Sequence, residues 1–193
     1  MIINMPIDTF KYFGLYSIVI FSVVTAYIVI RWHSDNALTL SRHIASHKKL
    51  YILFAITSVL AQSLFWLFMV FWFAPHFNLG FVFIAIMTLG SIGQLTAALV
   101  PDKDIGGVTT IVHYASAVVM MLVMYTFTLW VSLSPAIEGF SKYFSAFAFV
   151  LMTILLIMLF SIKKARSKVF IYQNVYLAMF YLTVLVAAYT TSK

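Results

Sequence analysis

Residues 50–101 read LYILFAITSVLAQSLFWLFMVFWFAPHFNLGFVFIAIMTLGSIGQLTAALVP and contain no lysine, arginine, aspartate or glutamate. A helix needs about 20 mainly apolar residues to cross the hydrocarbon core of a bilayer. The run is therefore long enough for two spanning helices. A turn-rich string at residues 74–80, which includes Pro75, Asn78 and Gly80, predicts the break between them.

The rest of the chain repeats this pattern. Of the 193 residues, 64% are hydrophobic and 9% are charged, and the mean hydropathy is +1.05. An ordinary soluble domain has about 25% charged residues. We therefore predict an all-α fold, a polytopic transmembrane bundle of about six helices that forms a single integral membrane domain over residues 1–193. The predicted spans are 12–31, 51–73, 80–100, 108–132, 143–162 and 170–190.

The positive charge of the chain lies in short loops beside the spans. The net charge is +7, but no basic domain carries it, so we expect no nucleic-acid partner. Loops one, three and five, with the flanking Arg31, hold nine lysines and arginines, whereas the other side holds Lys11, Lys142 and Lys193. Lysine and arginine concentrate on the cytoplasmic side of membrane proteins. This predicts cytoplasmic loops one, three and five, termini outside, and contact with anionic lipids.

Several function classes are disfavoured by what the spans lack. No acidic or basic residue lies in the interior of a span, whereas proton pumps, ion-coupled transporters and voltage sensors usually need one there. The last span has no lysine for a retinal Schiff base, and no glycine-rich phosphate loop or HExxH motif occurs. Without cysteine there is no disulfide, thiolate metal site or cysteine nucleophile. We expect no cofactor.

The densest polar cluster follows the third span. Asp102 and Asp104 come just before the fourth span, His113 lies in its first turns, and Ser116 lies one turn deeper on the same helix face. One interpretation is a capped helix with a hydrogen-bonded interfacial histidine. The other is a polar site facing lipid headgroups or a small cavity. There an Asp–His pair would act as acid and base or hold a metal.

Small and polar residues also line the middle of spans two and three. Gly90, Ser91 and Gly93 favour close helix packing in lipid. Gln94 lies about two turns from Asp102, and Gln62 is in the middle of span two. These amides either form interhelical hydrogen bonds or extend a polar lining from the Asp102 and His113 cluster. Ser63, Gln173, Asn174 and Tyr176 are the further candidates for that lining.

Loop one contains two histidines four residues apart, His43 and His47. On one helix they would share a face and, with His33 or Asp35, could hold a divalent metal. The spacing is a weak metal signal without a known third ligand. The alternative is a short amphipathic helix on the cytoplasmic leaflet.

Gly90-x-x-Gly93, the turn Val100-Pro101-Asp102, Gly106 and the later His113 resemble a known group. This group comprises bacterial and archaeal six-span membrane proteins of unknown function related to the eukaryotic DRAM/Sfk/Frag superfamily. Its third span tends to end in a Pro-Asp turn, and a histidine follows near the start of the fourth. The resemblance implies membrane-lipid homeostasis or lipid remodelling, and it transfers to Asp102 and His113 alone.

Four functional hypotheses follow. The first is binding of membrane lipids or a part in membrane-lipid homeostasis, at a polar site at headgroup depth. The second is a small-solute transporter or channel with a path along Gln62, Ser63, Ser91 and Gln94. The third is an intramembrane enzyme acting on a lipid, which needs Asp102, Asp104 and His113 to converge. The fourth is an accessory subunit with a membrane-protein partner. Whether the chain is an enzyme stays open, and no catalytic residue is assigned.

Overall fold

The computed structural model describes residues 8–31, 39–102 and 107–191, without the side chains of 165 and 166. In this part of the chain it is an all-helical bundle with six helices that are long and apolar enough to cross a membrane, which confirms the predicted fold class. The long helices are α1 (Thr9–Arg31), α3 (Lys48–Phe68), α5 (Phe81–Leu99), α6 (Val108–Leu133), α7 (Gly139–Ser161) and α8 (Val169–Thr190). Shorter segments are α2 (Leu40–Ala45), η1 (Met69–Phe73), α4 (Ala74–His76) and η2 (Lys163–Lys168).

Large apolar side chains cover the outside of the bundle. Val23, Phe147 and Ile157 are 61%, 59% and 57% exposed, and every long helix carries similar residues. Soluble monomers rarely expose contiguous apolar surface on this scale, whereas hydrocarbon solvates it without penalty. The chain is therefore a multi-pass integral membrane protein.

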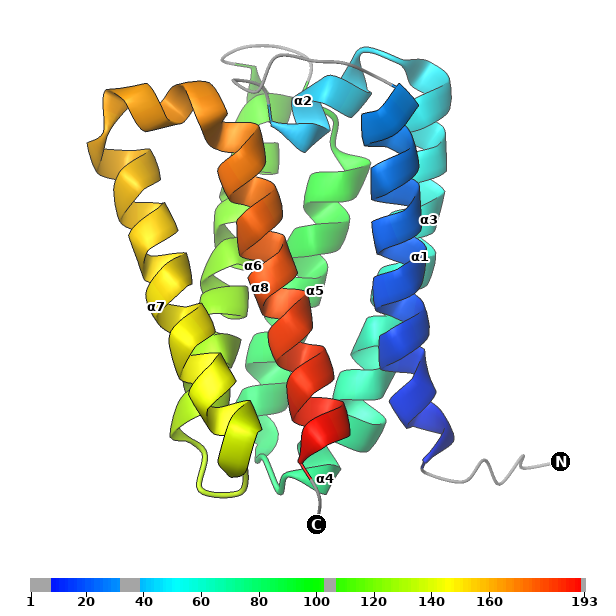
Figure 1. Ribbon diagram of the computed structural model, residues 1–193. Helices are drawn as coiled ribbons and strands as arrows, with labels where there is room; N and C mark the ends of the chain where they lie inside the picture. The colour runs from blue at the N-terminus through cyan, green and yellow to red at the C-terminus, as the bar shows by residue number, and fades with distance from the viewer. Residues whose placement is uncertain (1–7, 32–38, 103–106, 192–193) are drawn as a thin grey trace, which may run out of the picture.

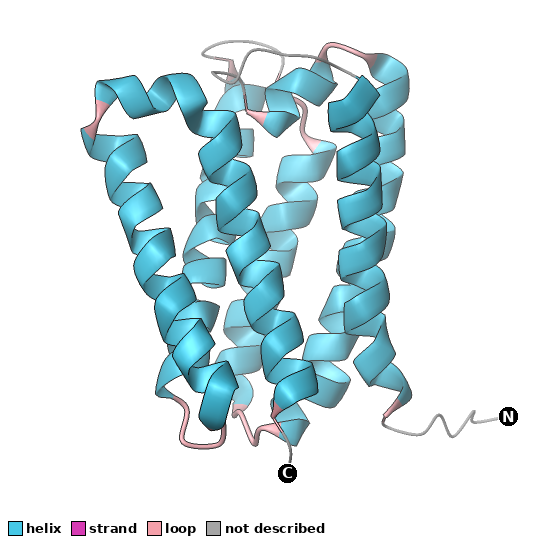
Figure 2. Ribbon diagram, in the orientation of Figure 1, coloured by secondary structure: helices cyan, strands magenta, loops and turns pink. Residues whose placement is uncertain are grey.

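The bundle has two different ends (Figure 1). The start of α1, the short α4 and the end of α8 lie at one end, and α2 and η2 lie at the other. Loops close the bundle at both ends (Figure 2), and the described residues contain no strand. The described segments of the connections predicted to be cytoplasmic thus share the α2 end.

An aromatic core fills the half of the bundle next to α4. Phe73 is fully buried, with its ring centroid 4.8 Å from that of Phe77 and 5.4 Å from that of Phe127. Phe83 and Phe180 complete the group, each within 6.0 Å of Phe127. Packing these large rings against one another removes much apolar surface from contact with the surroundings of the bundle. The end near α2 has no comparable aromatic cluster among the described residues.

The break predicted at residues 74–80 begins three residues too early. The helix continues from α3 through η1 and α4 to His76, and it includes Pro75. Proline lacks an N–H and its ring clashes with the carbonyl four residues earlier. The wider π turn of η1, in which Ala74 N–H donates to the carbonyl of Met69, accommodates it.

The turn itself is a Schellman motif at Asn78. Asn78 has a positive φ of 52°, which asparagine tolerates better than most residues. Its N–H donates to the carbonyl of Pro75 at 3.2 Å, and Leu79 N–H donates to that of Ala74 at 2.8 Å. Both bonds satisfy carbonyls that the helix end would otherwise leave unpaired.

Two glycines allow α5 and α6 to pack closely, as predicted. A Cβ atom on Gly90 would lie 2.5 Å from Val123 Cγ1, and one on Gly93 would lie 3.0 Å from the backbone oxygen of Ser116. Neither position leaves room for a side chain without movement. The small-residue pattern of span three therefore marks a real helix–helix contact, which sets where the first turns of α6 stand against the end of α5.

Candidate functional site

The short helix α2 covers one end of the bundle. Thr39 caps it, because its Oγ1 accepts a hydrogen bond from Arg42 N–H at 3.4 Å. Leu40 and Ile44 are buried against Ile28 of α1. Leu40 N–H also donates to Gln173 Oε1 of α8 at 3.3 Å. The helix is thus held between α1 and α8 rather than lying free on the leaflet.

The two loop-one histidines do not share a helix face. Helix α2 ends at Ala45, and its buried His43 stacks on Phe170 with ring centroids 6.1 Å apart. His47 is the N-cap of α3 in extended conformation, with φ −127°. The described residues contain no group of three or more histidines, cysteines or acids placed to hold a metal. His33 and Asp35 lie outside the described residues.

Asp102 is a buried carboxylate that joins three segments. It follows the end of α5, and its side chain is fully buried. Thr110 Oγ1 donates to Oδ1 at 3.3 Å and the Tyr114 hydroxyl donates to Oδ2 at 3.3 Å, both from α6. Arg42 Nε of α2 lies 3.4 Å from Oδ2. A buried charge is tolerated only when it is paired and hydrogen-bonded in this way.

His113 bonds to partners other than Asp102. Its Nδ1 lies 2.8 Å from the carbonyl oxygen of Val100, which only accepts, so Nδ1 carries the hydrogen. Its Nε2 lies 2.9 Å from Ser41 Oγ of α2. In the neutral ring Nε2 accepts, and the Ser41 hydroxyl donates to it. The structure therefore places a Ser–His pair here, in place of the Asp–His hydrogen bond considered from the sequence.

Two adjoining cavities meet at this pair. The larger has a volume of 380 Å³ and lies among α2, α6, α7 and α8. The smaller, of 60 Å³, reaches into the bundle toward Ser58 and Gln94. Residues that line both are Ser41, His113, Ala117, Met120, Gln173 and Leu177. The polar site that the sequence predicts at headgroup depth therefore lies beside cavities in the structure.

The two cavities differ in character. Beyond Ser41, His113 and Gln173, the larger is lined mainly by apolar side chains such as Met121, Leu156 and Phe160. In the smaller, Ser58 is completely buried, and among the described residues no group hydrogen-bonds to its Oγ. A polar cavity needs only about 10–15 Å³ to hold a water. The smaller cavity has room for a few waters or one small polar group.

The remaining candidates take different positions. Gln62 Nε2 donates to Ser91 Oγ at 2.7 Å in a contact that leaves a cavity of only 10 Å³. Gln94 borders the smaller cavity. Ser63 is exposed on the outside of the bundle. Of the four residues of the predicted transport path, only Gln94 borders the cavities that meet at His113.

Two further predicted residues stand apart from the pair. Ser116 presents its backbone oxygen to Gly93 in the α5–α6 contact. Asp104 lies outside the described residues.

Ser41, Arg42, Thr110 and Tyr114 were not singled out from the sequence. Thr110 and Tyr114 are four apart on α6, a spacing that places both hydroxyls on one face, and this pattern beside Asp102 is a usable signal. The sequence gives no such signal for Ser41, because its partner His113 lies 72 residues away along the chain. Only the packing of α2 brings it there.

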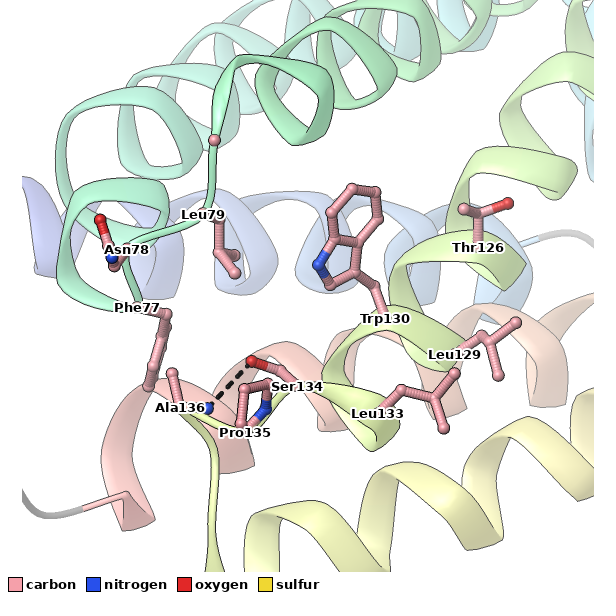
Figure 3. A pocket seen from close by; sticks show the side chains of 11 residues that line it. Phe77, Asn78, Leu79, Thr126, Leu129, Trp130, Leu133, Ser134, Pro135 and Ala136 are labelled. Carbon is pink, nitrogen blue, oxygen red and sulfur yellow. Dashed lines mark hydrogen bonds between the residues drawn. The ribbon is translucent and has the colours of Figure 1, made fainter.

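A separate cavity of 520 Å³ lies at the opposite end of the molecule (Figure 3). It is formed by the α4–α5 turn and the end of α6, with Trp130 and Leu133 on one side and Leu79 on the other. Ala136 N–H donates to Ser134 Oγ at 3.3 Å and closes the turn beside it. No acidic or basic side chain lines it, so it offers no acid–base chemistry.

No family model, curated protein or solved structure matches this chain. The described residues contain six candidate membrane-spanning helices, a number that by itself identifies no family.

Proposed function

We propose that the protein binds a membrane lipid, with an acyl chain in the 380 Å³ cavity and the polar end of the lipid toward Ser41, His113 and Gln173. The observation that carries this proposal is the combination of an apolar cavity with polar side chains at one end. Its volume lies within the range of about 300–1,000 Å³ typical of ligand sites. A role in membrane-lipid homeostasis, as the family resemblance implies, follows from such binding.

The depth of the site favours a lipid over a water-soluble ligand. His113 is five residues into α6, which is about 8 Å along the helix axis from Val108. The polar end of the cavity is thus near the end of the bundle, where headgroups and ester linkages lie, and apolar residues such as Met121 and Leu177 line its deeper part. Exposed lysines at this end, among them Lys48, Lys164 and Lys168, would attract anionic headgroups.

The same lysines support the proposed orientation. Loops one, three and five carry most of the positive charge, and the segments described from them lie at the α2 end. By the positive-inside rule this end is cytoplasmic and both termini are outside. The proposed lipid then comes from the cytoplasmic leaflet.

A cavity-filling variant tests the proposal. Ala117 lines the cavity, whereas Ala115 lies on the exposed surface of the same helix. We expect Ala117→Phe to weaken binding of a pyrene-labelled phosphatidylglycerol at least tenfold, measured by fluorescence in detergent micelles. Ala115→Phe adds the same ring to the outer surface and should bind like the wild type. Wild-type affinity in a folded Ala117→Phe variant would refute the proposal.

A further inference from the structure

We infer that Ser41 and His113 are a nucleophile and general base that cleave a fatty-acyl ester held in the 380 Å³ cavity. This inference rests on the proposed lipid binding and extends it to a reaction. A serine hydroxyl is a weak nucleophile until an adjacent base removes its proton. His113 Nε2, at 2.9 Å from Ser41 Oγ, is within the distance at which such bases act.

The imidazole is oriented as a catalytic base requires. A third group must hold the ring so that Nε2 presents its lone pair to the serine. Here the Val100 carbonyl accepts from Nδ1 at 2.8 Å and fixes that tautomer. His113 itself is buried, and the backbone oxygen belongs to the segment that ends α5. The nucleophile, the base and the orienting group thus form one connected chain of hydrogen bonds.

The helix that carries Ser41 is anchored on both sides of it. The preceding residue, Leu40, donates its N–H to Gln173 Oε1, and the following residue, Arg42, pairs with buried Asp102. Fixing a nucleophile in this way lowers the entropy lost on reaching the reactive geometry. Asp102 and Arg42 are therefore positioning residues in this reaction.

The cavities indicate the substrate class. The larger one is apolar apart from the end at Ser41, which suits the acyl chain of a lipid ester with its carbonyl carbon beside Ser41. Gln173 borders both cavities, and its amide nitrogen supplies N–H donors for the oxygen that becomes negative. The smaller cavity has polar groups at Ser58, Gln94 and His113 in a mainly apolar lining, and it is large enough to hold the attacking water.

The reaction consumes one water and needs no oxidant or reductant. Ser41 Oγ attacks the ester carbonyl while its proton passes to His113 Nε2. The carbon–oxygen bond to the alcohol breaks, and the alcohol leaves with that proton, which gives an acyl-serine. His113 then removes a proton from water as the water attacks the acyl carbon. Release of the fatty acid returns the proton to Ser41.

Covalent labelling in detergent micelles tests the pair directly. A fluorophosphonate probe with a long alkyl chain should label the purified wild-type protein, and mass spectrometry of the peptides should place the label on Ser41. Ser41→Ala should abolish labelling, and His113→Gln should slow it about 100-fold or more. Ser46→Ala is the matched control, because Ser46 also lies beside a histidine, His47 at 3.2 Å, but in an exposed position. It should label like the wild type.

The outcomes separate catalysis from binding. Localisation of the label to Ser41 in the wild type supports the inference even where a variant folds poorly. Absence of label, or a label that persists in Ser41→Ala, overturns it. A wild type that binds the pyrene-labelled phosphatidylglycerol but takes up no fluorophosphonate overturns the inference and leaves lipid binding intact. If the wild type neither binds the pyrene-labelled phosphatidylglycerol nor reacts with the fluorophosphonate, both the inference and the proposed lipid binding are overturned.

Discussion

Asp102 shows how one buried charge organises this end of the protein. Its side chain is fully buried, whereas that of its ionic partner Arg42 is 31% exposed. The two residues therefore respond differently to loss of the other. An uncompensated charge is far more unfavourable inside the bundle than at its surface, so the carboxylate depends on the arginine more than the reverse.

We expect Arg42→Gln to be more destabilising than Asp102→Asn. The first leaves a buried carboxylate without a counter-charge and should lower the free energy of unfolding by about 3 kcal/mol. The second leaves a neutral amide with Thr110 and Tyr114 as partners and should lower it by about 1 kcal/mol. Unfolding by SDS in mixed micelles measures both. Lys49→Gln, at an exposed position, is the control. A larger loss for Asp102→Asn would contradict this account of the pair.

At the residue scale the sequence located polar groups but not their partners. Asp102 and His113 formed a pair in one of the two interpretations, and both are buried at the end of α5 and the start of α6. Their hydrogen bonds go elsewhere, to Thr110, Tyr114 and the Val100 carbonyl. The direction of each side chain depends on helix rotation, which residue spacing along one helix does not specify.

Among the elements, α5 and α6 show the tightest constraint, because two glycines leave no space for a Cβ. At Gly90 the obstacle is the side chain of Val123, whereas at Gly93 the nearest atoms are the backbone oxygen of Ser116 and the backbone nitrogen of Met120. A side chain can be shortened by mutation, but backbone cannot. The two sites should therefore differ in whether a second mutation rescues them.

Gly93→Ala should separate α5 from α6 and lower stability by about 1–3 kcal/mol, the usual effect of overpacking. Gly90→Ala should have a similar effect that Val123→Ala reverses, because the smaller residue removes the clash. Gly80→Ala is the control, since nothing lies within 4 Å of a Cβ there. Thermal unfolding in detergent measures these variants and the double variant Gly93→Ala/Val123→Ala. Rescue of Gly93→Ala by Val123→Ala would show that the backbone contact does not limit the packing.

Helix α2 shows that a sequence can predict a helix without predicting what the helix contacts. The sequence predicts a short helix in loop one, and the structure contains one at Leu40–Ala45. An amphipathic pattern does not say what the apolar face contacts. Leu40 and Ile44 lie against Ile28 in the bundle rather than on lipid, and His47 belongs to the start of the next helix. The end of α2 separates the two histidines.

The aromatic cluster and the cavities beside His113 lie in different halves of the molecule. The aromatic cluster around Phe73 and Phe127 lies near α4, and the two cavities that meet at His113 lie near α2. The aromatic cluster stabilises the arrangement of the helices. Because the cavities beside His113 lie outside this cluster, a ligand there leaves it intact.

Orientation in the membrane is a prediction about the whole molecule. The chain contains no cysteine, so single cysteines can be placed freely at exposed sites. We expect Glu138→Cys, between α6 and α7, to react with a membrane-impermeant maleimide on intact cells. Ser167→Cys, between α7 and α8, should react only after the membrane is opened. The reverse pattern would place the α2 end outside.

The number of spans, the helical class and the approximate helix ends followed from the sequence alone. They depend on local composition and length, because hydrocarbon admits apolar helices of about 20 residues wherever these occur. The pairing of Ser41 with His113, the burial of Asp102 and the cavities between α6, α7 and α8 were decided only by the tertiary structure. They depend on how helices rotate and pack against one another, and contacts of short range along the chain do not encode that geometry.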